Sequence, residues 1–183
     1  MLAAPRRGGQ VLALSGAGFI VDSTTDEVIT RLRGHRAQIA DAAFSADDAR
    51  LIIASRDGTA RVWDAEAGSS IAELVGHTGG VNRALLNPDS TLAVTGGEDG
   101  TVRIWDGATG RAVETVTHHG GEVRGLALVA GGTSVISAGL DGEVRIASCL
   151  LCLSTRELFE LASSRVTRDL TEAERSGQLR GGR

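Results

Sequence analysis

Short apolar runs alternate with turn residues along most of the chain. Four such runs in the middle of the sequence are rich in β-branched residues: Val81 to Asn87, Thr91 to Thr95, Thr101 to Trp105 and Ala112 to Val116. An Asp-Gly pair, Asp99-Gly100, separates the second run from the third and is a strong hairpin signal. β-branched residues favour strands, and turns at intervals of about eight to twelve residues predict an all-β protein.

The pattern recurs with a period of 42 residues and no insertion. Asp-Gly pairs, Trp-Asp pairs and single histidines all keep this period. They are Asp57-Gly58, Asp99-Gly100 and Asp141-Gly142; Trp63-Asp64 and Trp105-Asp106; and His35, His77 and His119. An incomplete copy lies one period earlier, where Val21 replaces the tryptophan and Ser15 replaces the aspartate. A fixed period of about 20 to 50 residues indicates a repeat architecture.

The Gly-His, Asp-Gly and Trp-Asp markers resemble those of the WD-repeat family of β-propellers, over roughly residues 10 to 148. The resemblance implies about three and a half four-stranded WD repeats in an incomplete ring, followed by a short C-terminal helical tail. In the first partial repeat we expect only the second to fourth strands, and in the last only the first to third. The expected parts are a flexible N-terminus (1–9), a partial repeat (10–33), two WD repeats (34–75 and 76–117), a partial repeat (118–148) and the tail (149–183).

A histidine, a hydroxyl, an aspartate and a tryptophan recur in the repeats. The family resemblance implies that they form a hydrogen-bonded tetrad, and buried polar groups in general need such partners. The repeat of residues 34–75, called the first repeat below, has Ile53 in place of the hydroxyl. The partial repeat of residues 118–148 has Ala147 in place of the tryptophan. The expected tetrad residues are His35, Asp57 and Trp63; His77, Thr95, Asp99 and Trp105; and His119, Ser137 and Asp141.

Serine, histidine and aspartate together also fit a hydrolase, which stays open as an alternative. A catalytic centre occurs once, whereas this set recurs with the period, so the pattern favours scaffolding. We therefore assign no catalytic residue, expect no cofactor and expect that the chain is not an enzyme. The sequence contains no lysine, which excludes a Walker-type NTPase within this chain.

Cys149 and Cys152 form a Cys-x-x-Cys pair, which could be half of a zinc site or a redox pair. Zinc needs two more ligands, and no second cysteine pair exists, so we expect structural thiols and no metal. A metal or redox protein remains an alternative. Ser154 and Glu157 then have the spacing of a capping box and predict a helix. This tail resembles the end of bacterial WD-repeat signalling proteins, which suggests that residue 183 is near a natural C-terminus and that further sequence lies upstream.

The net charge is −4 and no segment is a block of one sign, which argues against a nucleic-acid-binding domain. No apolar run approaches the roughly 20 residues that span a membrane, so we expect a cytoplasmic protein. The resemblance implies a non-enzymatic protein–protein interaction scaffold or regulatory sensor, part of a larger bacterial signalling protein. Side chains just after each histidine and just before each turn aspartate are the partner-binding candidates, with a merely solvated rim as the alternative. The positions are Gln38, Ala40 and Arg56; Gly80, Asn82 and Glu98; and Glu122, Arg124 and Leu140. The candidates among them are Gln38, Arg56, Asn82, Glu98, Glu122 and Arg124.

Closure of such a ring takes about four to eight repeats, more than this sequence supplies. Three arrangements therefore stay open. Further repeats lie upstream, or two copies complete a ring as a homodimer, or the chain forms an open arc.

Overall fold

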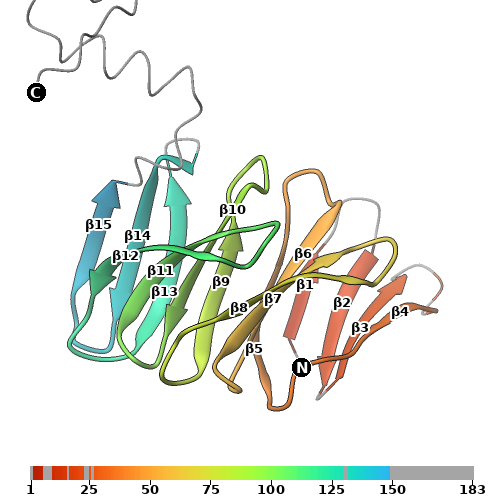
Figure 1. Ribbon diagram of the computed structural model, residues 1–183. Coiled ribbons are helices and arrows are strands. Elements are labelled where there is room, and N and C mark those ends of the chain that lie inside the picture. The colour runs from red at the N-terminus through yellow and green to blue at the C-terminus, as the bar shows by residue number, and fades with distance from the viewer. Residues whose placement is uncertain are drawn as a thin grey trace, which may run out of the picture. The chain divides into compact units, whose positions relative to one another are not determined.

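In the computed structural model, the chain forms four antiparallel sheets that follow one another in sequence order (Figure 1). The residues that this structure describes are 2–5, 10–15, 17–22, 25, 27–129 and 132–148. The all-β prediction is confirmed for this part of the chain. Cys149, Cys152 and the predicted helical tail lie outside it.

Strands that are consecutive in sequence pair with each other in every sheet. The first sheet contains β1 (Leu2–Pro5), β2 (Gln10–Ser15), β3 (Ala17–Asp22) and β4 (Val28–Leu32). The second contains β5 (Ile39–Phe44), β6 (Arg50–Ser55), β7 (Thr59–Asp64) and β8 (Ser70–Val75). The third contains β9 (Val81–Leu86), β10 (Leu92–Gly97), β11 (Thr101–Asp106) and β12 (Ala112–His118). The last contains β13 (Val123–Val129), β14 (Ser134–Gly139) and β15 (Val144–Ser148).

Strand β1 differs from the expectation of a flexible N-terminus and a three-stranded first repeat. It pairs with β2 in a register that runs from Leu2 opposite Leu14 to Pro5 opposite Val11. The segment carries none of the repeat markers, and proline has no N–H to donate to a ladder, so its sequence gives no strand signal. Residues 2–5 nevertheless form a strand, and the first sheet has four strands. The last sheet has its expected three.

The Asp-Gly pairs form the hairpins between the second and third strands of three sheets. Gly58, Gly100 and Gly142 have φ angles of 86°, 75° and 78°, a region that glycine enters without steric cost. In the third sheet, Asp99 Oδ1 accepts the N–H of Thr101 at 3.0 Å, which closes the turn with a side chain. The local sequence therefore determines these hairpins.

Apolar side chains fill the spaces between neighbouring sheets, as β6 illustrates. Leu51 and Ile53 belong to the cluster shared with the first sheet, and Ile52 and Ala54 to the cluster shared with the third. All four are 0% exposed. Burial of one Leu or Ile side chain contributes about 1.5–3 kcal/mol, so the spaces between sheets hold the protein together.

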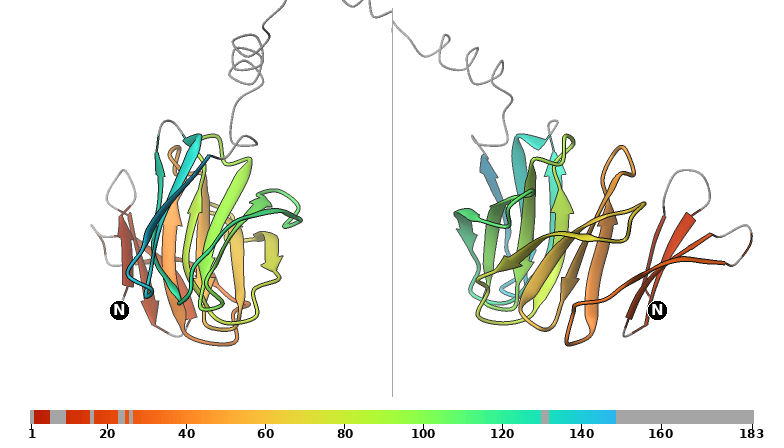
Figure 2. Two further views of the ribbon diagram at one scale, coloured as in Figure 1. Left: turned by 90° about the vertical axis from the view of Figure 1, so that its left-hand side faces the viewer. Right: turned by 45° about the vertical axis from the view of Figure 1, so that its right-hand side comes forward.

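The right-hand view of Figure 2 shows the β1–β4 sheet at one end of the row of sheets and the β13–β15 sheet at the other. The two middle sheets therefore have a neighbour on each face, and each end sheet has one. None of the described residues belongs to a helix with the length and hydropathy needed to cross a membrane.

Candidate functional site

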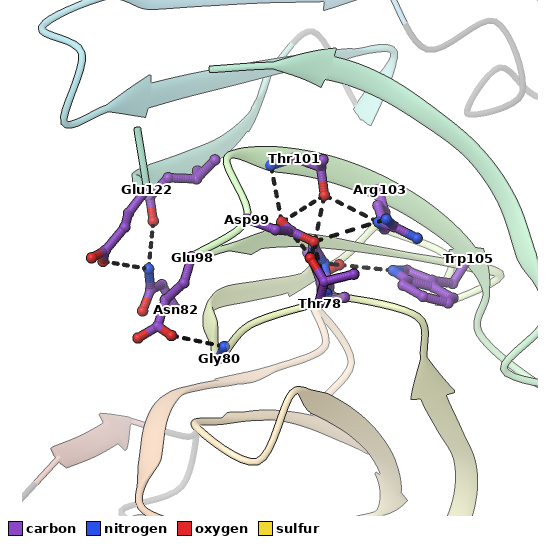
Figure 3. A network of polar contacts seen from close by, with 12 residues as sticks. Thr78, Gly80, Asn82, Glu98, Asp99, Thr101, Arg103, Trp105 and Glu122 are labelled. Atoms are coloured by element: carbon purple, nitrogen blue, oxygen red, sulfur yellow. Dashed lines mark hydrogen bonds and ion pairs between the residues drawn. The ribbon is translucent and has the colours of Figure 1, made fainter. Parts of the chain in front are cut away.

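The complete polar tetrad lies in the third sheet (Figure 3). His77, which precedes β9, has its Nδ1 atom 2.9 Å from Asp99 Oδ1 and its Nε2 atom 2.7 Å from Thr95 Oγ1. Trp105 Nε1 donates to the same hydroxyl oxygen at 2.8 Å. With Nδ1 donating to the carboxylate, Nε2 of the neutral imidazole accepts the hydroxyl proton. The four side chains thus connect the loop before β9, strand β10, the Asp-Gly turn and strand β11.

The Asp99 carboxylate is held ionised by several donors. It accepts the N–H of Thr78 at 3.0 Å and the hydroxyl of Thr101 at 2.8 Å, in addition to the His77 contact. Burial alone would raise the pKa of Asp99, but the hydrogen bonds from His77 and Thr101 outweigh it and lower that pKa to about 2. Burial lowers the pKa of His77 by more than the neighbouring carboxylate raises it. The pair is therefore an anionic aspartate beside a neutral histidine at pH 7.

A glycine makes room for the imidazole in two of the repeats. A Cβ atom added at Gly97 would lie 2.4 Å from His77 Nδ1, and one added at Gly139 would lie 2.5 Å from His119 Nδ1. Real Cβ atoms do not come this close, so a side chain at either position displaces the histidine. The first repeat has Ser55 at the equivalent place, which is its second departure from the pattern after Ile53.

In the last sheet the set lacks its tryptophan. His119 Nε2 lies 2.8 Å from Ser137 Oγ, and His119 Nδ1 lies 3.1 Å from Asp141. Burial would raise the pKa of Asp141, but hydrogen bonds from the backbone N–H groups of Glu143 and Gly120 outweigh it and lower that pKa to about 2. Ala147 stands where an indole N–H would otherwise reach the hydroxyl.

In the repeat of residues 34–75, two buried polar atoms of the tetrad residues have no partner. His35 Nδ1 contacts Asp57 Oδ2 at 3.0 Å, as in the other repeats. His35 Nε2 and Trp63 Nε1, however, make no hydrogen bond, because Ile53 supplies no hydroxyl between them. The side chain of His35 is only 5% exposed, and Trp63 is 3% exposed, so solvent does not satisfy these atoms.

The order carboxylate–imidazole–hydroxyl is also that of a hydrolytic triad. Here the hydroxyls of Thr95 and Ser137 belong to buried residues, and in the third sheet an indole N–H takes up the hydroxyl oxygen. A nucleophile must be reachable by its substrate, so this geometry fits a structural relay. Among the described residues, no three His, Cys, Asp or Glu side chains gather in a way that could hold a metal ion.

The partner-binding candidates lie on the loop ends, where several contact one another across sheets. Arg56, in the turn after β6, forms an ion pair with Glu98, in the turn after β10. Glu98 also accepts the backbone N–H of Gly80 at 2.9 Å (Figure 3). The backbone carbonyl of Gln38 accepts the N–H of Arg56 at 2.8 Å. The Arg56–Glu98 ion pair therefore links the second sheet to the third, and both of its side chains are about one-third exposed.

Asn82 was expected on the exposed surface, but it is only 5% exposed. Its Nδ2 atom donates to the backbone carbonyl of Val123 at 3.1 Å and lies 3.4 Å from Glu122 Oε2. Asn82 is therefore buried against the last sheet, and its side chain links β9 to β13 by a hydrogen bond. Glu122 itself forms an ion pair with Arg124 at 2.8 Å, and both side chains are partly exposed.

Leu140 has the expected position just before the turn aspartate of the last repeat, one period after Glu98 and two after Arg56, and it is an exposed apolar residue on the same loop ends. Its exposed fraction is 62%. Its backbone N–H donates to the carbonyl of Glu122 at 2.9 Å, which places it beside the Glu122–Arg124 ion pair.

Comparison with known proteins agrees with this repeat structure. Three segments match the family described as "WD domain, G-beta repeat": residues 26–64, 68–106 and 110–148. Each segment begins near the fourth strand of one sheet and ends on the third strand of the next. No curated protein matches the sequence significantly.

Among solved structures, the fold is similar to that in the "Crystal structure of the computationally designed Ika4 protein". The TM-score is 0.70 at 24% sequence identity, over 80% of this chain and 88% of that one. This likeness shows the fold alone. The family match extends over more than half of the sequence, and therefore the chain belongs to the WD-repeat family.

Proposed function

We propose that this chain is a non-enzymatic protein-interaction module that binds its partner through the loop ends carrying Arg56, Glu98, Leu140 and the Glu122–Arg124 pair. The observation that carries the proposal is the division of the polar residues between two places. The His–Asp–hydroxyl sets of the third and last sheets are buried, whereas the charged candidates are partly exposed and Leu140 is exposed on the loops. Membership of the WD-repeat family supports an interaction scaffold.

The chemistry of this surface indicates how a partner would bind. Leu140 offers an exposed apolar side chain with a cation and an anion beside it. Interfaces commonly have an apolar centre that excludes water and a polar rim that gives register. A partner segment with one apolar side chain flanked by charged groups would match this arrangement.

We also propose that the module acts as a scaffold or regulatory sensor within a larger bacterial signalling protein, in the cytoplasm. The support is the resemblance of residues 149–174 to the end of such proteins, which the sequence alone carries. Binding of a signalling protein through the loop ends would agree with this role.

The experiment is affinity capture with the purified chain, followed by direct titration of each captured protein after its own purification. We expect Leu140→Asp to weaken the binding of a true partner about 10-fold or more, since it puts a charge in the apolar centre. Val113→Asp is the matched control, because Val113 is a partly exposed valine on the outer strand β12. If Leu140→Asp leaves the affinity of a purified partner unchanged, the binding surface for that partner lies elsewhere on the protein.

The hydrolase alternative needs its own test. Acyl and phosphoryl probes are offered to the wild-type chain and to Ser137→Ala. Burial of Ser137 predicts no labelling of either protein. Labelling or turnover that disappears in Ser137→Ala would contradict the proposal and establish an enzyme.

A further inference from the structure

The exposed face of the β13–β15 sheet has the same apolar pattern as faces that are buried elsewhere in this chain. Val144 and Ile146 of β15 are 68% and 72% exposed. One period earlier, Val102 and Ile104 of β11 are 0% exposed, because the last sheet covers them. The pattern of side chains is therefore that of an interface between sheets, without a sheet on top of it.

The register of the strands shows that whole rows of residues are equivalent. On the face toward the following sheet, a row of three apolar residues crosses the first three strands. The rows are Ala43–Ile52–Val62 in the second sheet, Leu85–Val94–Ile104 in the third and Ala127–Ile136–Ile146 in the last. The first two rows contribute to the cores between sheets. The third row continues the same interface onto a face that nothing in the described chain covers.

A second row repeats in the same way. Gly96 pairs with Val102 in the third sheet, and Ala138 pairs with Val144 in the last. Arg145, between Val144 and Ile146, is directed to the other face, where it contacts the carbonyl of His118. The charged and apolar residues of β15 thus alternate, so that the uncovered face is apolar.

The first sheet, at the opposite end of the row, also has a face on which none of the described sheets lies (Figure 2). Ile20 is fully buried against the second sheet. Phe19, which precedes Ile20 in β3, belongs to the opposite face, where the guanidinium of Arg31 lies over its ring. An apolar run such as Val11 to Leu14 is typical of a strand with a sheet on each face, as in β6.

We propose that two copies of this chain form a closed ring, in which the β13–β15 face of each copy packs against the β1–β4 face of the other. Each copy then supplies to its partner the sheet that follows in the row. Four sheets from each chain give eight in the ring, within the range of about four to eight that closes such rings. The two contacts are related by a two-fold axis, which leaves no uncovered sheet face.

The test begins with the mass in solution of the full chain, measured by sedimentation or light scattering over a range of concentrations. We expect twice the mass of one chain. A single-chain mass over the whole range would overturn the proposal, and so would a filament or any larger assembly.

Ile146→Arg tests the face. The variant places a cation on the apolar row, opposite a face on which Arg31 pairs with Phe19 in the register. We expect dissociation to single chains, with self-association weakened about 100-fold, because an unpaired charge would be buried. Val75→Arg is the control: Val75 is 64% exposed on the outer strand β8, outside the two faces, and its variant keeps the wild-type mass.

A mixture of two variants tests which faces meet. Phe19→Glu alone and Ile146→Arg alone are each expected to be single chains. When mixed, they form a heterodimer, because one contact then contains both opposite charges and the other contact is wild-type. The far-UV circular dichroism of each variant shows that it is folded, and Ile146→Ser gives a second measurement without a charge. Failure of the mixture to pair, or an unchanged mass for both Ile146 variants, would overturn the proposal.

Discussion

Ile53→Thr is expected to stabilise the protein, although it puts a polar group into a core position. Ile53 occupies the place that Thr95 has in the complete tetrad one period later. There the hydroxyl lies 2.7 Å from His77 Nε2 and 2.8 Å from Trp105 Nε1. In the first repeat the corresponding atoms, on His35 and Trp63, are buried without a partner. A threonine hydroxyl at residue 53 would serve both.

The magnitude follows from two opposing contributions. Each unpaired buried polar atom costs about 1–3 kcal/mol, and the new hydroxyl would relieve two of them. The loss of the terminal methyl group of isoleucine costs about 0.5–1.5 kcal/mol, and the hydroxyl must itself be desolvated. The net increase in the free energy of unfolding is about 1–2 kcal/mol, which corresponds to a rise of roughly 2–4 °C in Tm per kcal/mol for a chain of this size.

Ile53→Val is the matched control, because valine has the shape of threonine without the hydroxyl. It is expected to lower the free energy of unfolding by about 1 kcal/mol. Urea unfolding at one fixed protein concentration measures both variants, since self-association adds to apparent stability. If Ile53→Thr is no more stable than Ile53→Val, the hydroxyl does not reach His35 and Trp63, and the reasoning is refuted. Ser55→Gly in the Ile53→Thr background then shows whether the Ser55 Cβ holds the imidazole away.

The complete tetrad should respond in the opposite sense: Asp99→Ala is expected to lower the free energy of unfolding by about 2–4 kcal/mol, because the buried donors around the carboxylate lose their acceptor, and a neutral result in urea melts would contradict the tetrad. Gly97→Ala should cost about 1–3 kcal/mol, since the new Cβ would lie 2.4 Å from His77 Nδ1 in the folded state, and the same melts measure it. Burial lowers the pKa of His35 and His77 below the value of 6.5 that holds in the unfolded chain, so the unfolded state binds more protons as the pH falls below about 6.5. The free energy of unfolding should therefore decrease on acidification by up to about 1.4 kcal/mol per pH unit for each histidine, until the lowered pKa is reached. Urea midpoints from pH 7.5 to pH 5 test this, and midpoints that rise with acidification would show that the histidines are charged in the folded state.

Much of the fold and of the tetrad is a consequence of local sequence. The Asp-Gly turns determine the hairpins because glycine alone enters their positive φ angles without steric cost. The period then puts each histidine near the turn aspartate of its own sheet, and His77–Asp99 contacts recur as His35–Asp57 and His119–Asp141. Ile53 already predicts an incomplete set in the first repeat, because a side chain without a hydroxyl cannot join an imidazole to an indole.

Other features depended on contacts between sheets, which no local pattern specifies. Asn82 is a polar residue of a type common on surfaces, but it is buried because the last sheet brings the carbonyl of Val123 to it. Strand β1 was missed because its place comes only from pairing with β2. Ile104 and Ile146 occupy equivalent positions, yet one is 0% and the other 72% exposed. The sequence determined that both lie on an apolar sheet face, and only the tertiary structure decided which face has a neighbouring sheet, since burial depends on what packs against a residue as well as on the residue itself.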